Sequence, residues 1–310
     1  MTLHIPDRWL ERAGHFPLVE QSKHWESLRQ WSLSGVYRVT LLSGATVIAK
    51  WSGGKMKGEP DLYNDVLAPL HIERPCIYAA FEDETGCYMM MEDVGTDTLE
   101  SKPSADAFLQ AARQLAVIHR TATSFMKDGA LAEEAFHRHY KGEDMFLDDL
   151  AYVTSHPFFA GSQRQVLERL VLLFPEHLER LYSEYPVTIV HNDYFPKNII
   201  VQEEGQGVRV IDWTNSYLSP HLGDLYGLSQ EAAAYGASRE QMLQAYAEAS
   251  GLYGNAELTL DWLVRVGGVC WFIHTIRWIL DYGRHVISGS EAWIGDMLLD
   301  LEELTNSMSR

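Results

Sequence analysis

The chain has 310 residues, of which 46% are hydrophobic, and a formal net charge of −18 at pH 7. This length and composition can bury a large core and predict two lobes or domains. The negative charge argues against a nucleic-acid binder, whose phosphate contacts need clustered Lys and Arg, but it is compatible with a cationic substrate.

The first predicted elements form a small β-rich lobe. Residues 1–20 contain no apolar run that could serve as a signal peptide, and residues 9–25 are expected to be a short amphipathic lead-in. Three β runs follow between residues 27 and 51, separated by turn residues at Leu33–Gly35 and Leu42–Ala45.

Lys50 ends the third β run, where a kinase places the lysine that pairs with nucleotide phosphates. Taken alone, it could equally be a solvated lysine at a strand end. The Gly- and Lys-rich loop at 52–58 cannot be written as a Walker A motif. A helix is predicted to start at Glu59, which is the expected ion-pair partner of Lys50, with Asp61 and Asp65 as rivals.

Two further β runs, 75–80 and 87–91, complete this lobe and lead into a linker that we expect to act as a hinge. The backbone of Glu92 and Val94 could hydrogen-bond an adenine edge there, with Met91 packing above it. Ordinary core filling is the alternative for Met91.

The rest of the chain is mainly helical. Ser104 could cap a helix that runs to about Thr123, and two or three helices are expected over 133–185, with breaks near His156 and at Pro175. The remaining helices are predicted over Arg239–Ser250, Leu258–Tyr282 and Glu291–Ser307.

The stretch 190–201, V-H-N-D-Y-F-P-K-N-I-I-V, carries the most specific pattern. Apolar β-formers flank a polar loop, which predicts a strand, a tight loop and a strand. His191, Asp193 and Asn198 form H-x-D-x-x-x-x-N, in which the carboxylate could accept a hydroxyl proton and the amide oxygen could hold Mg²⁺. His191 taken alone could equally be a strand-end histidine bonded to the backbone.

A second apolar strand, 208–211, delivers Asp212 in V-I-D-W, where another carboxylate could ligate the same metal. A hairpin turn at 203–207 would let both strand ends converge on one site. Asp224 opens a helix twelve residues after Asp212 and is expected to be a structural cap or loop anchor.

Together these motifs resemble the aminoglycoside phosphotransferase and choline kinase-like family, relatives of the eukaryotic-type protein kinases. The resemblance covers about residues 27–228. It implies an α+β, bilobal protein-kinase-like fold. A small antiparallel β N-lobe with one main helix, residues 1–92, would bind the nucleotide, and a larger, mainly α-helical C-lobe, residues 93–310, would carry the catalytic loop and bind the substrate.

The resemblance also implies a kinase that uses ATP or GTP with Mg²⁺ and phosphorylates a hydroxyl of a small, aminoglycoside- or choline-like molecule. By the motif positions, Lys50 would bind the α/β-phosphates and Glu59 would orient it, Asp193 and His191 would be catalytic, and Asn198 and Asp212 would hold Mg²⁺.

Two departures from the protein-kinase pattern shape the prediction. No G-x-G-x-x-G is present, so the loop that covers the phosphates must lie at Trp31–Tyr37 and include Ser34 and Gly35. No D-F-G or A-P-E is present, and only eleven residues separate Asp212 from Asp224, which leaves no room for an activation loop. Small-molecule acceptors are therefore favoured over proteins.

Two neighbours of the motifs bear on the substrate. Asn192 resembles the H-N-D of choline and ethanolamine kinases, whereas Thr214 replaces an acid often found in relatives. Acids on the C-terminal helices, such as Asp261 and Asp281, could join aromatic residues there to bind a cationic amine. Those aromatic residues, which could equally be core, are Trp262, Trp271, Phe272, Trp278 and Tyr282.

The cysteines and apolar stretches predict the surroundings of the protein. Cys76, Cys87 and Cys270 have neither metal-ligand spacing nor an even framework, so we expect a reduced, cytoplasmic protein. The apolar stretch 263–280 contains three ionisable residues and predicts a buried helix rather than a membrane span. The alternatives left open are a nucleotide-binding module without turnover and a protein kinase-like enzyme.

Overall fold

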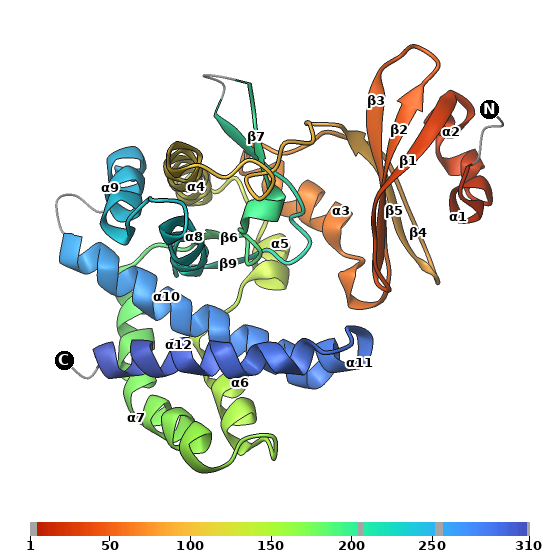
Figure 1. Ribbon diagram of the computed structural model, residues 1–310. Helices are drawn as coiled ribbons and strands as arrows, with labels where there is room; N and C mark the ends of the chain where they lie inside the picture. Colours follow the sequence, from red (N-terminus) through yellow and green to blue (C-terminus); the bar gives the residue numbers. More distant parts are fainter. Residues whose placement is uncertain (1–4, 204–206, 252–256, 309–310) are drawn as a thin grey trace.

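The computed structural model describes residues 5–203, 207–251 and 257–308. An antiparallel β-sheet stands on one side and a larger helical part on the other (Figure 1). This arrangement confirms the predicted α+β, kinase-like fold. Most of the predicted turn at 203–207 lies outside the described residues.

The sheet contains five strands in the order β1-β2-β3-β5-β4, and every neighbouring pair is antiparallel. The strands are β1 (Ser22–Gln30), β2 (Ser34–Leu41), β3 (Thr46–Ser52), β4 (Ile77–Asp83) and β5 (Gly86–Glu92). Strand β3 lies in the centre of the sheet and so fixes the backbone of Lys50, which pairs with Val36 of β2 on one side and Met89 of β5 on the other.

The N-terminal segment covers one face of the sheet. The short helices α1 (Asp7–Leu10) and α2 (Pro17–Glu20), with a 3₁₀ turn between them, bring Trp9 and Phe16 into a core with Tyr88. The amphipathic lead-in predicted up to residue 25 ends earlier, because β1 already starts at Ser22. Most of β1 is exposed, as expected for an edge strand, so its sequence shows little alternation.

The helix that follows β3 belongs to the core of the helical part. It comprises α3 (Glu59–Leu62) and a π-helical turn, η3 (Tyr63–Leu67). Its buried side chains pack with those of the C-terminal helices in one cluster rather than with the strand core. The boundary between lobes at residues 92 and 93 therefore stays a prediction, because this helix joins the two parts.

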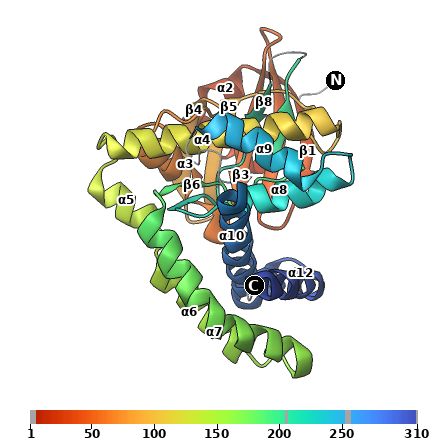
Figure 2. The same ribbon diagram turned by 90° about the vertical axis from the view of Figure 1, so that its left-hand side faces the viewer.

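The helical part builds on α4 (Ala105–Lys127) and α10 (Glu257–Trp278), which is extended by a π turn, η5 (Ile279–Gly283). The other helices are α5 (Glu133–His139), α6 (Glu143–Ser155), α7 (Gly161–Glu184), α8 (Gly223–Ala233), α9 (Arg239–Ser250), α11 (Arg284–Val286) and α12 (Trp293–Met308). In Figure 2, α6 and α7 extend together away from the rest of the molecule.

One sequence-based expectation is wrong in this part. Pro175 does not break the chain but lies inside α7, where the buried side chains of Phe174 and Leu178 hold both sides of the helix in the core.

Strands flank the H-x-D loop as predicted, and each pairs with a strand further along the chain. The first strand, β6 (Thr188–Val190), pairs with β9 (Tyr217–Ser219), and the second, β7 (Ile199–Val201), pairs with β8 (Val208–Val210).

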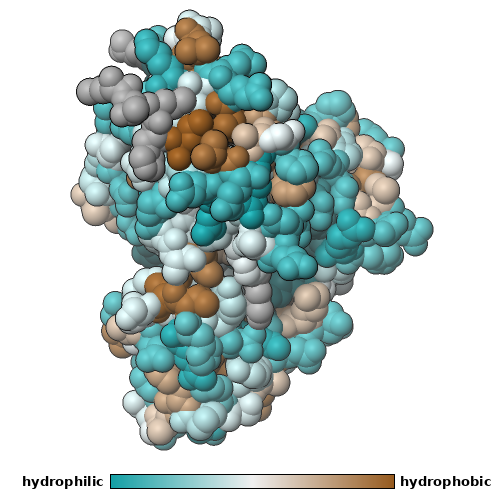
Figure 3. Space-filling model, turned by 90° about the vertical axis from the view of Figure 1, so that its right-hand side faces the viewer, coloured by the Kyte–Doolittle hydropathy of each residue, from teal (hydrophilic) through white to brown (hydrophobic). Residues whose placement is uncertain are grey.

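The stretch Thr259–Val286 is apolar enough to cross a membrane by length and composition, but 67% of its most apolar window is buried inside the protein. This agrees with the predicted core helix. The face of the molecule in Figure 3 is mostly hydrophilic, in keeping with the net charge of −18, and its hydrophobic residues gather in small patches.

Candidate active site

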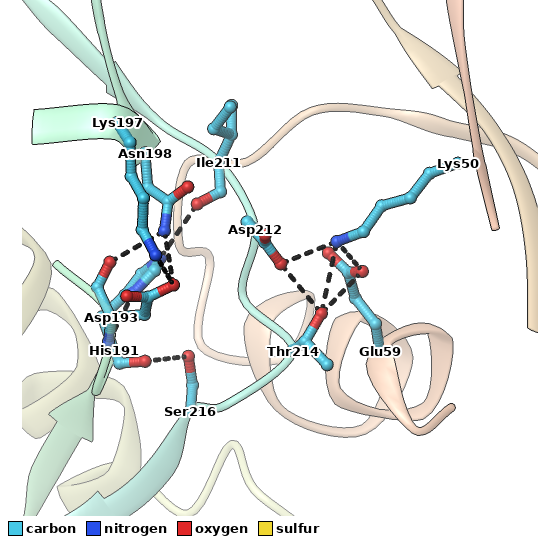
Figure 4. A network of polar contacts seen from close by, with 10 residues as sticks. All are labelled: Lys50, Glu59, His191, Asp193, Lys197, Asn198, Ile211, Asp212, Thr214 and Ser216. Carbon is cyan, nitrogen blue, oxygen red and sulfur yellow. Dashed lines mark hydrogen bonds and ion pairs between the residues drawn. The ribbon is translucent and has the colours of Figure 1, made fainter. Parts of the chain in front are cut away.

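Lys50 of β3, Glu59 of α3 and Asp212 after β8 meet in one contact network (Figure 4). Lys50 Nζ lies 2.5 Å from Glu59 Oε2 and 2.7 Å from Asp212 Oδ1. The Thr214 hydroxyl lies 2.9 Å from the same two oxygens and can donate to either. Glu59 is thus the partner of Lys50, whereas its rival Asp65 pairs with an arginine of α5.

In this network, attraction between opposite charges outweighs the pKa shifts that burial would cause in Lys50 and Asp212. Burial alone lowers the pKa of Lys50, but the charges of Asp212 and Glu59 outweigh it and raise that pKa. Burial likewise opposes ionisation of Asp212, yet the attraction of Lys50 leaves the pKa of Asp212 lowered. Burial raises the pKa of Glu59. The positive charge of Lys50 opposes this shift, whereas the negative charge of the neighbouring Asp212 adds to it. Lys50 and Asp212 are therefore a charged pair at neutral pH.

Asp193 lies in the loop between β6 and β7. Its Oδ2 accepts a hydrogen bond from Asn198 Nδ2 at 2.9 Å and lies 3.0 Å from Lys197 Nζ. Its Oδ1 makes no hydrogen bond with any described residue. Burial raises the pKa of Asp193, and the charge of Lys197 opposes that shift. One carboxylate oxygen is thus held in place and the other is free to accept a proton.

His191 holds the loop together through contacts with the backbone. Its Nε2 donates to the carbonyl of Ile211 at 3.1 Å, and its Nδ1 accepts from the backbone N–H of Asp193. Burial lowers the pKa of His191 to about 4, so the ring is neutral at pH 7. Both ring nitrogens contact the backbone, which favours a positioning role for His191, and its predicted catalytic role stays a prediction.

Asp224, at the start of α8, anchors the same loop. Its carboxylate accepts the backbone N–H groups of His191 at 2.6 Å and Asn192 at 2.8 Å. The anchor role expected from the sequence is what these contacts provide. They hold Asn192 at a φ of +63°, in the left-handed region that Gly and Asn tolerate best.

We expect Asn192→Val to lower the free energy of unfolding by about 1–2 kcal/mol, because a β-branched residue is strained at positive φ. Urea denaturation measures the change. Asn192→Gly, which adopts this φ freely, is the matched control. Equal stability of the Val and Gly variants would show that the backbone there is not constrained.

Asn198 and Asp212 are adjacent because the backbone N–H of Ile211 donates to the carbonyl of Asn198 at 3.0 Å. The amide nitrogen of Asn198 is committed to Asp193, which leaves its Oδ1 free, and Asp212 Oδ2 has no hydrogen-bond partner among the described residues. The described residues contain no group of three or more His, Cys, Asp or Glu that could hold a metal alone. Two oxygens fit Mg²⁺, which usually binds through one or two carboxylates together with substrate phosphates.

A cavity of about 340 Å³ opens beside these groups. Asn192, Asp193, Lys197 and Asp212 line one end of it. The remaining wall comes from the loop between β1 and β2, from α10 and from the α11–α12 region, and includes Trp31, Trp271, Trp278 and Trp293. A small molecule in this cavity would lie against Asp193.

The two residues predicted to cover the phosphates line different cavities. Ser34 lines the cavity that also contains Asp193. Gly35 instead lines a separate pocket of about 260 Å³ with Arg8 and Tyr37. Since side chains alternate along a strand, these neighbours cannot both face the cavity.

The predicted hinge residues are tied to both parts of the chain. Glu92 pairs with Arg209 at 2.6 Å, and its backbone N–H donates to the carbonyl of Cys76, so only its carbonyl could meet a base. The Val94 carbonyl accepts from Gln202, which leaves its N–H for that purpose. Met91 is 6% exposed and packs in a small apolar cluster. This matches core filling, the alternative to a contact with adenine.

The acidic wall expected from the C-terminal helices does not form. Asp261 pairs with Arg239 and Arg265 away from the cavity, and Asp281 does not line it. Of the predicted aromatic residues, Trp271 and Trp278 line the cavity; the others, Trp262, Phe272 and Tyr282, do not.

Sequence reasoning missed two participants. Lys197 contacts Asp193, and its place four residues later in the loop was a signal that could have been used. Thr214, noted only as a departure from relatives, joins the Lys50 network through its hydroxyl. Nothing in the sequence marks Trp293, which lies near no motif, and Trp31 was noted only as the first residue of the predicted phosphate-covering loop.

We expect Lys197→Met to move the acid limb of the rate–pH profile to higher pH. Burial already raises the pKa of Asp193, Lys197 counteracts it, and a base must be deprotonated to act. The profile of ADP release with an accepted hydroxyl compound measures the shift. Lys102→Met, at an exposed lysine paired with Asp97, is the control and should leave the limb unchanged. If the acid limb does not move in Lys197→Met, the limb does not report the ionisation of Asp193.

A model of the phosphotransferase enzyme family, APH, matches residues 54–262 of the chain. A search of the curated proteins finds no match.

Solved structures resemble the chain over almost its whole length. The ADP-bound aminoglycoside phosphotransferase APH(2'')-Ib is 16% identical, with a TM-score of 0.66, and the match covers 96% of this chain and 98% of that one. The gentamicin complex of APH(2'')-IIa is 15% identical, with a TM-score of 0.67 and coverage of 98% and 99%. The Plasmodium vivax ethanolamine kinase is 14% identical, with a TM-score of 0.62 and coverage of 94% and 85%. At these identities the likeness shows a shared fold.

Proposed function

Because the chain belongs to the phosphotransferase enzyme family and is a kinase for hydroxyl groups of small molecules, we propose that its phosphoryl donor is ATP. We further propose that Lys50, Asp193, Asn198 and Asp212 carry the reaction. One observation supports this most: Asp193 and Asp212 line a cavity large enough for a small acceptor, and they are contacted there by Asn198 and by Lys50, which comes from a distant strand. The neighbour solved with ADP favours an adenine nucleotide, with GTP as the alternative.

Each residue has a role that its contacts support. Lys50, held by Glu59, would bind the nucleotide phosphates with a permanent positive charge. Mg²⁺, when bound by Asn198 Oδ1 and Asp212 Oδ2, supplies charge neutralisation on the phosphates. Thr214 would hold Asp212 Oδ1 when Lys50 turns toward a nucleotide.

Asp193 would act as the base. Its free Oδ1 accepts the acceptor's hydroxyl proton while the hydroxyl oxygen forms a bond to the γ-phosphorus and the bond from that phosphorus to ADP breaks. Asn198 and Lys197 fix the other carboxylate oxygen and so orient the base. The Glu92 carbonyl and the Val94 N–H would bind the edge of the base of the nucleotide.

The segment between Asp212 and Asp224 favours a small acceptor over a protein. It contains β9 and the entry to α8, and residues 216–226 are all buried. It therefore presents no exposed loop that could hold an extended peptide. We also propose that the protein acts in the cytoplasm, as its free cysteines suggest.

A screen of hydroxyl-bearing metabolites and antibiotics coupled to ADP release tests this function. We expect acceptor-dependent ADP release that requires Mg²⁺. If the protein binds nucleotide but releases no ADP, either with any acceptor or with water alone, the nucleotide-binding module would be favoured instead. Labelling of a protein mixture with [γ-³²P]ATP tests the protein-kinase alternative.

A further inference from the structure

The wall of the cavity that faces the catalytic end is aromatic. Trp31 and Trp293 expose 48% and 46% of their surfaces, and half-buried Trp271 and Trp278 lie beside them. Large exposed apolar side chains that gather around a cavity mark a binding surface. Indole faces bind flat, apolar rings well, and they also attract cations, so the charges around them decide between these ligands.

Every carboxylate that lines the cavity already faces a cation. The lining residues include only two acids among the described part of the chain, Asp193 and Asp212. Asp193 lies 3.0 Å from Lys197 Nζ, and Asp212 lies 2.7 Å from Lys50 Nζ. A positively charged acceptor would therefore meet only carboxylates whose charge is already balanced by Lys197 or Lys50.

The buried acid behind the wall is also paired with cations. Asp149 is buried beneath the wall and is bound by Lys141 at 2.7 Å and by Arg277 at 3.0 Å, so two cations share one carboxylate. In front of the wall, the Arg29 guanidinium stacks 3.8 Å from the ring centroid of Trp31. The half-buried Arg29 thus already occupies one aromatic face that a cationic ligand would need.

His274 presents a ring nitrogen to the cavity. Its Nδ1 lies 2.5 Å from Lys141 Nζ and 3.0 Å from Asp149 Oδ2, so this nitrogen is occupied by the ion pair behind the wall. Nε2 has no partner among the described residues, and the ring lines the cavity. In either tautomer this nitrogen can pair with a hydroxyl group of a ligand, because a hydroxyl both donates and accepts.

We propose that the acceptor is an uncharged or anionic alcohol with an apolar ring body, rather than a polycation or a quaternary amine. This rests on the proposed kinase function and selects the substrate class of the same site. In this arrangement the ring packs against the tryptophans, Arg29 binds an oxygen atom, and His274 Nε2 contacts a hydroxyl group. The acceptor hydroxyl lies at Asp193.

Calorimetric titration with three matched probes tests the proposal. 3-Phenyllactate, 3-phenylpropane-1,2-diol and phenylalaninol share a benzyl group and a hydroxyl and carry charges of −1, 0 and +1. Choline and kanamycin complete the set. Titrations are run on the full chain, with and without Mg²⁺ and a non-hydrolysable ATP analogue. We expect phenyllactate and the diol to bind at least about tenfold more tightly than the three cations.

Charge reversal at the wall gives a second readout. Arg29→Glu should weaken phenyllactate about tenfold, strengthen phenylalaninol and leave the diol unchanged. Lys23→Glu, an exposed cation on the same strand, is the control and should preserve the wild-type order.

Failure of the two ideas can be told apart. Absence of binding by the ATP analogue overturns the kinase proposal, and the titrations without nucleotide still decide the acceptor class. Tightest binding by phenylalaninol, choline or kanamycin, or no difference among the probes, overturns the acceptor class and leaves the kinase proposal standing.

Discussion

Asp193→Asn is expected to lower kcat by about 10²–10⁴-fold while changing the affinity for Mg²⁺ and nucleotide by less than about twofold. The amide cannot accept the hydroxyl proton, but it keeps the size of the carboxylate and its place beside Asn198 and Lys197. Nucleotide contacts are assigned to Lys50 and Asp212, which Asp193 does not touch. An amide oxygen at position 193 can still accept the hydrogen bond that orients Asn198, the other proposed Mg²⁺ ligand.

Single-turnover transfer of labelled phosphate and equilibrium binding of a nucleotide analogue measure the two quantities separately. Asp148→Asn, at an exposed acid of α6, is the control and should retain full turnover. Turnover within tenfold of wild type in Asp193→Asn would remove Asp193 as the base. A parallel loss of nucleotide binding would mean that the loop had collapsed.

Asp212→Asn is expected to reduce kcat/KM by at least about 10²-fold and to raise the Mg²⁺ concentration needed for half-maximal rate. Asp212 is the only carboxylate in the proposed metal pair, and its charge also positions Lys50. Asn is the substitution of choice because φ at this position is +62°, where Asn is tolerated. Lys50 keeps Glu59 as a partner, so the variant should fold.

Mg²⁺ titration of ADP release and thermal unfolding are the two measurements. A wild-type Mg²⁺ requirement in Asp212→Asn would exclude Asp212 as a ligand. Asp97→Asn, at an exposed carboxylate in a surface ion pair, serves as the control for loss of one negative charge. Surface pairs of this kind contribute little to stability, so this control should also match wild type in thermal unfolding.

Much of the active-site chemistry could be predicted from local spacing. H-x-D-x-x-x-x-N, the strand-end lysine and the I-D strand end identified Lys50, Asp193, Asn198 and Asp212, and the structure brings all four together. Such patterns are readable because each residue's role depends on a short loop or strand end. The helix boundaries were less readable: Pro175 looked like a break, but tertiary packing outweighs the loss of one backbone hydrogen bond.

The sequence by itself determined the fold class, the order of the elements and the candidate residues for phosphoryl transfer, because periodicity and motif spacing are local properties. Only the tertiary structure decided that Glu59 pairs with Lys50, that His191 contacts the backbone, and that the cavity wall is aromatic without free acids. Trp31 and Trp278 lie far apart in sequence and share one cavity. Their meeting depends on how the sheet and α10 pack, and no local pattern records that.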